Sequence, residues 1–137
     1  MSELHRTDYL VVGGGIAGVS CTEMLYTLDP DAKITLITAT SIVKSVSGVN
    51  QITKLITEFQ VQEQNVDEWY KSHQGIKVYK GKLMKIDPAE KIVELDDGMR
   101  MQYGKLCICT GAHAKLISES PHVIGIRDTA SVLNLQV

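Results

Sequence analysis

Apolar residues recur with two different periods along the chain, and the change of period predicts the order of its elements. Residues 9–12 and 33–38 are short apolar or β-branched runs, which are typical of buried parallel strands. Between these runs, four apolar side chains recur near helical spacing: Ile16, Val19, Met24 and Leu28. We expect them to form the face of a helix that packs against a sheet and ends at the Asp-Pro-Asp sequence of residues 29–31. The first 38 residues therefore predict a strand–helix–strand unit.

The middle of the chain is more polar. Residues 39–48 are rich in serine and threonine, which favours a loop, and a moderately amphipathic segment follows over residues 51–59. A second, short helix is predicted over residues 66–73, where the apolar positions share one face. Trp69 lies on that face, and we expect it to belong to the core.

From residue 76 the apolar period becomes two, which predicts a series of strands. These strands cover residues 76–79, 83–86, 92–95 and 99–103. Asp97-Gly98 is a strong signal for a hairpin turn, so we expect an antiparallel meander. A further apolar strand over residues 105–109 then returns the chain to the parallel sheet. The predicted fold class is α/β, with a partial doubly wound parallel sheet and an antiparallel β-meander inserted in it.

The first strand runs directly into a Gly-x-Gly-x-x-Gly sequence, which in this context is typical of dinucleotide binding. Its six residues are Gly13, Gly14, Gly15, Ile16, Ala17 and Gly18. The first glycine permits a tight turn, the second lets the backbone approach a pyrophosphate, and the third lets helix and strand pack closely. Free N–H groups at the helix start then face the anion. The alternative is a structural loop that binds no ligand.

Two further strand ends belong to the same predicted site. In such units an acidic residue at the end of the second strand usually binds a ribose hydroxyl, but here that place is held by Thr38, followed by Ala39. A neutral hydroxyl weakens this bond by about 1 kcal/mol. The strand over residues 105–109 ends at Thr110, Gly111 and Ala112, whose small side chains permit close approach of a ligand.

Composition narrows the class of partner. The chain has 137 residues with a hydrophobic content of 44%, which suits one domain. The net charge of -2 and pI near 6.1 give no basic surface, so we expect neither nucleic acid nor an anionic membrane as partner. No apolar stretch has the length of a membrane span, and no secretion signal precedes the first strand. A cytoplasmic or nuclear location follows as an expectation.

Few side chains offer chemistry of their own. The cysteines, Cys21, Cys107 and Cys109, lie on predicted elements in positions typical of core packing rather than redox work. The four histidines lack the spacing of metal ligands, so no metal site is predicted. We identify no catalytic acid, base or nucleophile, and Lys44 on its own pattern is a solvated surface lysine. Small-molecule binding through the backbone is the expected chemistry.

The two glycine motifs, at residues 12–18 and 105–112, together with the Asp97-Gly98 hairpin, resemble the first half of the flavin domain in the pyridine nucleotide-disulphide oxidoreductase family. Lys44, residues 51–54 and residues 125–129 resemble one subgroup of that family, which looks like an oxidative-stress protein of nucleus and cytoplasm. The resemblance covers nearly the whole chain.

This resemblance implies FAD as the cofactor. Its pyrophosphate would lie at Gly13, Gly15 and Gly18, its adenosine near Thr38 and Ala39, and residues 110–112 would line it from the neighbouring strand. Members of this kind take hydride from NADH or NADPH onto the flavin. Lys44 stands where related enzymes often carry a lysine close to the flavin ring.

The sequence also departs from the family pattern. Residues 41–59 contain no cysteine pair, which excludes a disulfide relay of the usual type. Cys109 replaces the usual alanine before Thr110. Residues 1–137 contain no second Gly-x-Gly-x-x-Gly for a nicotinamide cofactor, so we expect an N-terminal part of a larger domain that transfers no hydride by itself and is marginally stable.

Two other functions remain open at the level of sequence. The chain is either such an oxidoreductase part or a non-catalytic module for nucleotide binding or protein contact, such as a truncated isoform. A flavin-dependent hydroxylase or tRNA-modifying flavoprotein shares the opening motif, but usually keeps an acid at the position of Thr38.

Overall fold

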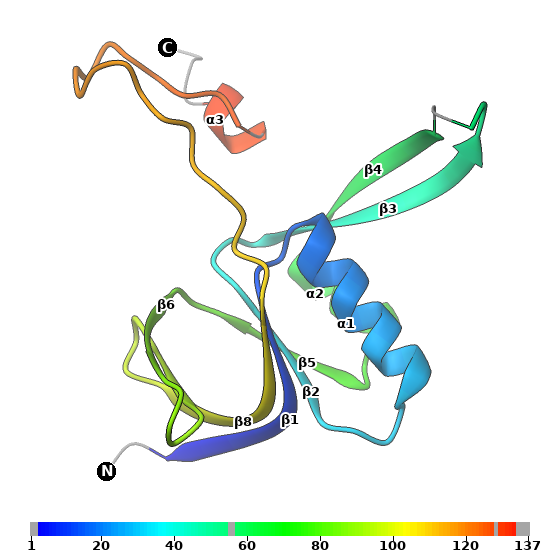
Figure 1. Ribbon diagram of the computed structural model, residues 1–137, viewed down its shortest axis with the longest axis vertical. Coiled ribbons are helices and arrows are strands. Elements are labelled where there is room, and N and C mark those ends of the chain that lie inside the picture. The colour runs from blue at the N-terminus through cyan, green and yellow to red at the C-terminus, as the bar shows by residue number, and fades with distance from the viewer. Residues whose placement is uncertain (1–2, 55–56, 128, 134–137) are drawn as a thin grey trace.

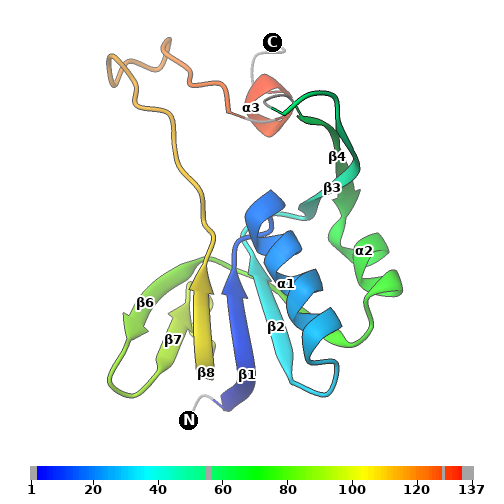
Figure 2. The same ribbon diagram turned by 45° about the vertical axis from the view of Figure 1, so that its right-hand side comes forward.

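The computed structural model describes residues 3–54, 57–127 and 129–133. Figures 1 and 2 show one strongly curved sheet with helices against one of its faces. The sheet contains six strands in the order β5-β2-β1-β8-β7-β6. Their bounds are β1 Leu4–Val12, β2 Ile34–Thr38, β5 Ile76–Lys80, β6 Leu83–Asp87, β7 Ile92–Leu95 and β8 Arg100–Ile108.

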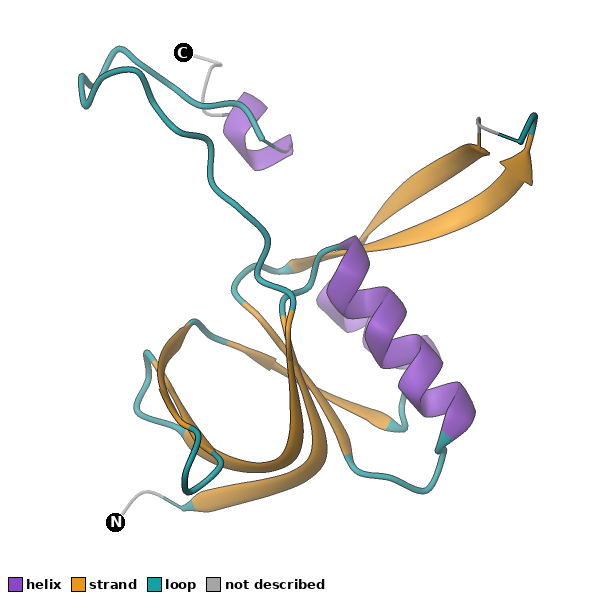
Figure 3. Ribbon diagram, in the orientation of Figure 1, coloured by secondary structure: helices purple, strands orange, loops and turns teal. Residues whose placement is uncertain are grey.

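The rest of the described chain forms three helices and a hairpin (Figure 3). The helices are α1 Ile16–Leu28, α2 Val66–Ser72 and α3 Thr129–Leu133, and the hairpin pairs β3 Ile42–Gln51 with β4 Thr57–Asn65. Strands β5, β2, β1 and β8 are parallel to one another, whereas β6, β7 and β8 pair antiparallel. The predicted fold class is therefore confirmed.

Both faces of the central strands are buried, which is usual for parallel sheets. Val11, Leu36 and Ile76 contribute to a core shared with α1 and α2, which also contains Trp69. Alternate residues of the same strands, such as Leu10 and Ile37, point to the opposite face and form a second core with Val93, Leu95 and Met101 from the antiparallel strands. The curvature of β6, β7 and β8 encloses this second core, and β2, all five residues of which are buried, is the most protected strand.

The predicted face of α1 was partly wrong. Val19 is buried as expected, but Met24 and Leu28 are 59% and 74% exposed. The side of α1 that meets the sheet contains Gly18 and Thr22 instead. Thr22 tolerates burial because its hydroxyl donates to the carbonyl oxygen of Gly18 at 2.7 Å. Gly18 and Thr22 therefore form a buried face that the spacing of apolar residues does not indicate.

The segment expected to be a loop followed by an amphipathic stretch is the β3–β4 hairpin. Val46 lies opposite Val61 in this ladder, and of the described β3 and β4 residues only Val43 is buried. A two-stranded ribbon with water on both sides needs little apolar alternation, so its sequence looks like a loop. Residues 55–56, within the predicted amphipathic segment, lie outside the described part of the chain.

The short helix predicted over residues 66–73 is confirmed as α2, and the burial of Trp69 in the core is confirmed with an exposure of 1%. The side chain of Asn65 accepts a hydrogen bond from the N–H of Asp67 at 2.9 Å and so caps the helix. Glu23 of α1 joins the two helices, because its carboxylate accepts from Trp69 Nε1 at 3.4 Å and lies 3.2 Å from His73 Nε2.

The predicted meander needs two corrections. The strand of residues 76–79 is β5, which pairs in parallel with β2 at the far edge of the sheet and is not part of the meander. The two strands predicted over residues 99–103 and 105–109 are one continuous strand, β8. Its first half pairs with β7 while its whole length pairs with β1, so one strand completes both parts of the sheet. The hairpin turn at Asp97-Gly98 is confirmed, with Gly98 at φ +84°.

Candidate dinucleotide-binding site

The predicted site residues gather at the carboxyl ends of the parallel strands. β1 ends at the glycine loop, β2 ends at Thr38, and β8 ends just before Thr110. The chain leaves β1 toward β2 on one side and reaches β8 on the other, so the point where strand order reverses lies between β1 and β8. Ligands of open α/β sheets bind at such a point. Tertiary structure thus places three separate sequence segments at one edge.

The backbone of the glycine loop is held by the ends of neighbouring strands. Gly13 has φ +123°, and its N–H donates to the carbonyl oxygen of Ile37 at 2.8 Å. A side chain on Gly13 would collide with the carbonyl oxygen of Cys109, and one on Gly18 would collide with the carbonyl oxygen of Gly13. Both positions therefore require glycine, because strand and helix approach too closely for a Cβ atom.

Gly15 has a different role. It precedes α1 as the N-cap in an extended conformation that any residue adopts (φ −78°, ψ −174°). A Cβ atom here would meet no atom of the described residues within 4 Å. Within the described chain no side chain caps α1, and the first turn contains no acidic residue. The N–H groups of Ile16, Ala17 and Gly18 are thus the orphan donors of a helix start, next to the open space at Gly15. An anion fits this cradle.

Thr38 and Ala39 lie beside the loop, but they differ in exposure. The Thr38 side chain is 1% exposed, and its hydroxyl donates to the carbonyl oxygen of Thr40 at 3.1 Å. A Cβ atom on Gly14 would lie 2.5 Å from the same hydroxyl oxygen, so Thr38 packs directly beneath the loop. This burial satisfies the hydroxyl internally, whereas Ala39 faces outward.

A cleft of ≈ 360 Å³ extends from Ala39 along the ends of β2 and β5. Its other lining residues are Lys80, Gly81, Lys82, Asp96 and Asp97. Lys80 Nζ donates to Ser41 Oγ at 2.7 Å, and the N–H of Lys82 donates to Asp96 Oδ1 at 3.0 Å. The sequence analysis did not place these residues in the site, although Gly81 directly after β5 is a signal of the same kind as the glycines that end β1 and β8. The cleft thus combines the amines of Lys80 and Lys82 with the carboxylates of Asp96 and Asp97.

Lys44 is tied to the glycine loop through its backbone, because its N–H donates to the carbonyl oxygen of Gly14 at 2.9 Å. Its side chain is not free in solvent: Nζ lies 3.4 Å from Glu63 Oε1 on β4, with side-chain exposures of 29% and 33%. The interpretation of Lys44 as a solvated surface lysine is therefore wrong. The β3–β4 ladder, which local sequence did not indicate, supplies the partner.

Thr110, Gly111 and Ala112 follow the end of β8 and are exposed. Gly111 has φ +76°, and the Arg127 guanidinium lies where a Gly111 side chain would be. The structure thus brings Gly111 next to Arg127, which the sequence placed in no site. Asp128 lies outside the described residues.

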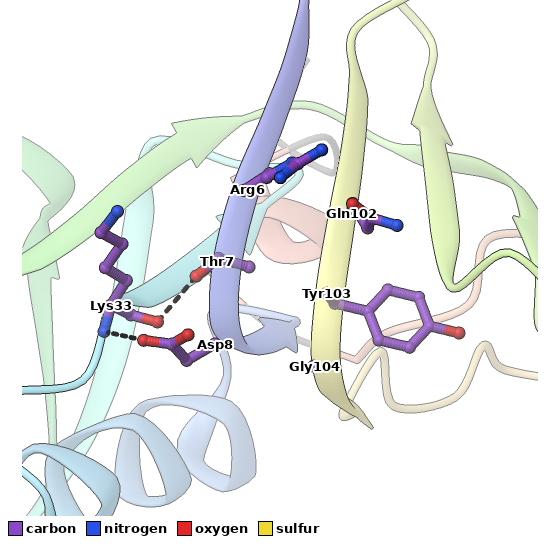
Figure 4. A pocket seen from close by; sticks show the side chains of 7 residues that line it. All are labelled: Arg6, Thr7, Asp8, Lys33, Gln102, Tyr103 and Gly104. Atoms are coloured by element: carbon purple, nitrogen blue, oxygen red, sulfur yellow. Dashed lines mark hydrogen bonds between the residues drawn. The ribbon is translucent and has the colours of Figure 1, made fainter.

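A second cleft, of ≈ 320 Å³, lies toward the amino end of β1 (Figure 4). It is lined by Arg6, Thr7, Asp8, Lys33, Gln102, Tyr103 and Gly104. Two of its polar groups are already engaged: the Thr7 hydroxyl donates to the Lys33 carbonyl oxygen at 2.8 Å, and Asp8 Oδ2 accepts from the Lys33 N–H at 2.7 Å. These bonds join β1 to the start of β2, so the polar groups of this cleft stabilise the fold.

The three cysteines pack against the core shared with α1, which confirms the core packing predicted for them. Burial is the main cause that raises the pKa of the Cys109 thiol to about 11, followed by its hydrogen bond with Cys107. Burial also raises the pKa of Cys21. These two thiols therefore stay protonated near neutral pH. Among the described residues, no group of three or more His, Cys, Asp or Glu side chains is arranged to hold a metal ion. No helix in the described ranges has the length and apolar character needed to cross a membrane.

Comparison with known proteins agrees with this geometry. The family described as pyridine nucleotide-disulphide oxidoreductase matches residues 7–136. Curated relatives, each called pyridine nucleotide-disulfide oxidoreductase domain-containing protein 1, come from Drosophila melanogaster (43% identity, 96% of this chain and 28% of the relative), Homo sapiens (43%, 93% and 26%) and Danio rerio (36%, 99% and 28%). The chain thus spans about a quarter of the length of these relatives.

Solved structures share the fold. A ferredoxin reductase from Rhodopseudomonas palustris matches with a TM-score of 0.71 and 20% identity, over 94% of this chain and 33% of its own. The NADH:rubredoxin oxidoreductase of Clostridium acetobutylicum matches with a TM-score of 0.65 and 21% identity, over 94% of this chain and 34% of its own. In both comparisons the shared part is about a third of the solved chain.

Proposed function

The chain belongs to the pyridine nucleotide-disulphide oxidoreductase family, and from this premise we propose that it is the FAD-binding part of an NAD(P)H-dependent flavoprotein oxidoreductase. The observation that carries the proposal is the uncapped start of α1 beside Gly15, which offers backbone donors and free space to a pyrophosphate. Both solved neighbours named above are named as a reductase or an oxidoreductase, which supports the same class.

We assign the parts of FAD as follows. Gly13 to Gly18 hold the pyrophosphate through backbone N–H groups and the helix dipole. The adenosine lies toward Ala39 and the cleft beyond it, where Thr38 supports the loop from below. Residues 110–112 line the cofactor from the end of β8. When bound, the flavin supplies the hydride and electron chemistry, and the protein supplies position and charge.

Titration of FAD with the purified chain tests this proposal directly. We expect saturable quenching of flavin fluorescence, because the pyrophosphate cradle is complete within residues 13–18. The same titration with ATP as competitor is expected to displace FAD, since both ligands present adenosine and phosphates to one site. An absence of saturable quenching would favour the alternative function, a non-catalytic module for protein contact.

Lys44 is proposed to place positive charge near the flavin ring. We expect Lys44→Met in the full-length protein to lower the flavin reduction potential by roughly 20–30 mV, which corresponds to about 1 kcal/mol for a partly exposed charge and a two-electron couple. Photoreduction against a reference dye measures the potential. Lys54→Met is the matched control, because Lys54 is exposed beyond the end of β3. Equal potentials in both variants would remove Lys44 from the flavin environment.

Hydride transfer by residues 1–137 alone is not expected, because this sequence has one dinucleotide motif and the reaction needs two nucleotides. The role in oxidative stress and the location in nucleus and cytoplasm stay predictions from the resemblance. The choice between NADH and NADPH belongs to the whole protein.

A further inference from the structure

The structure brings two thiols together directly beneath the glycine loop. Cys107 is the penultimate residue of β8, and Cys109 lies one residue beyond the end of this strand. Because side chains alternate along a strand, both point to the same side of the sheet. Their Sγ atoms are 3.4 Å apart. Cys21 of α1 also interacts with Cys107. The position of the pair matters because the Cys109 carbonyl oxygen packs against Gly13 and the Cys109 N–H donates to the Val12 carbonyl oxygen at 2.7 Å.

We propose that Cys107 and Cys109 form a redox-active dithiol whose reversible oxidation to a disulfide changes the geometry of the dinucleotide loop. Two residues apart on a strand, the Cα atoms are separated by about 6.6 Å, which lies within the range of natural disulfides. This inference does not depend on which dinucleotide the loop binds.

The reaction is a two-step exchange with a small disulfide such as oxidised glutathione. One cysteine loses its proton and attacks the glutathione disulfide, which forms a mixed disulfide and releases one glutathione thiolate. The second cysteine, also deprotonated, attacks the protein sulfur of that mixed disulfide and releases the other glutathione. The protein loses two protons and two electrons, and both are gained by the two glutathione thiols. Because burial raises the pKa of the Cys109 thiol to about 11, we expect the exchange to be slow near neutral pH and faster at pH 8–9.

The separation of the two sulfurs shows how oxidation would affect the glycine loop. A disulfide bond is about 2.05 Å long, so the two sulfurs must approach by about 1.4 Å from their present separation. The rotation or backbone shift this requires at Cys109 acts on the carbonyl oxygen that supports Gly13. Oxidation is therefore expected to loosen residues 13–18.

Mass spectrometry of the chain tests the bond itself. Cleavage after Lys105 and Lys115 places both cysteines in one peptide, residues 106–115, whereas Cys21 falls in the peptide of residues 7–33. After treatment with oxidised glutathione at pH 8.5 and alkylation, we expect the peptide 106–115 to be about 2 Da lighter than the reduced form and free of alkyl groups. Dithiothreitol should restore two alkylated thiols.

Two variants separate this pair from other thiol chemistry. Cys21→Ala should keep the 2 Da loss, and Cys109→Ala should abolish it. A cross-link between the two peptides would instead show a bond from Cys21 to Cys107 or Cys109 and overturn the assignment, as would a stable glutathione adduct or two persistently free thiols. Hydrogen exchange provides the readout for the loop: amides of residues 13–18 should exchange at least tenfold faster in the oxidised chain, and not in treated Cys109→Ala. Unchanged exchange in a chain shown to be oxidised would refute the coupling.

Discussion

Replacing Gly13 with alanine is expected to remove at least about 3 kcal/mol from the free energy of unfolding. Two separate costs add at this position. Gly13 has φ +123°, a conformation that residues with a side chain rarely adopt, and the new Cβ atom would collide with the Cys109 carbonyl oxygen. That oxygen belongs to the backbone, so it has little freedom to move. Because domains of this size are stabilised by only about 5–15 kcal/mol, a large share of the stability would be lost.

Gly98→Ala is the matched control for the Gly13 variant. Gly98 also has a positive φ, +84°, but a Cβ atom there meets no atom of the described residues within 4 Å. Its substitution should therefore cost only the conformational part, about 1–2 kcal/mol. Urea denaturation followed by the fluorescence of Trp69 measures both variants. Equal losses of stability for the two variants would mean that the collision of the new Cβ atom in Gly13→Ala with the Cys109 carbonyl oxygen adds no cost.

Unlike Gly13→Ala, Gly15→Ser is expected to leave the stability unchanged or slightly raised. It should instead reduce the affinity for FAD about tenfold or more. Serine is a better N-cap than glycine by a few tenths of a kcal/mol, and the extended backbone of Gly15 accepts it. Its side chain, however, would fill the open space in front of α1. Its hydroxyl would also accept from the N–H of Ala17 or Gly18, which are the donors assigned to the pyrophosphate.

Parallel measurements of melting temperature and flavin fluorescence check this second prediction. The stability measurement acts as the internal control, since a folded Gly15→Ser chain that no longer binds FAD attributes the loss to the site. If the variant kept the parent affinity, the pyrophosphate would have to bind elsewhere than at the start of α1.

Local patterns were sufficient where each segment carries its own signal. The buried strands β1 and β2, the helix between them and the Asp97-Gly98 turn are all visible in the sequence, because runs of apolar residues and glycines specify them over short distances. Local patterns failed at the β3–β4 hairpin, whose pairing joins Lys44 to Glu63 across the ribbon. They also failed for β5, because the sequence of a five-residue strand does not determine which neighbouring strand it pairs with.

The candidate site shows the same division. The turn predicted at Gly13 and the close packing predicted at Gly18 match the geometry, whereas the approach of Gly15 to a pyrophosphate stays a prediction. Lys80, Lys82 and Asp96, which line the cleft beside Ala39, were missed because they are far from the glycine loop in sequence. The burial of Thr38 was also missed, since its orientation depends on the loop that packs above it.

By itself, the sequence determined the α/β class, the family and the place of the dinucleotide loop, because glycine spacing and apolar period act within a few residues. Only the tertiary structure decided which strands are neighbours, where Lys44 finds its partner and that two thiols meet beneath the loop. Those relations depend on contacts between segments distant in the chain. The free energy of these contacts comes from the burial of apolar faces of distant segments against one another, which no local sequence pattern indicates.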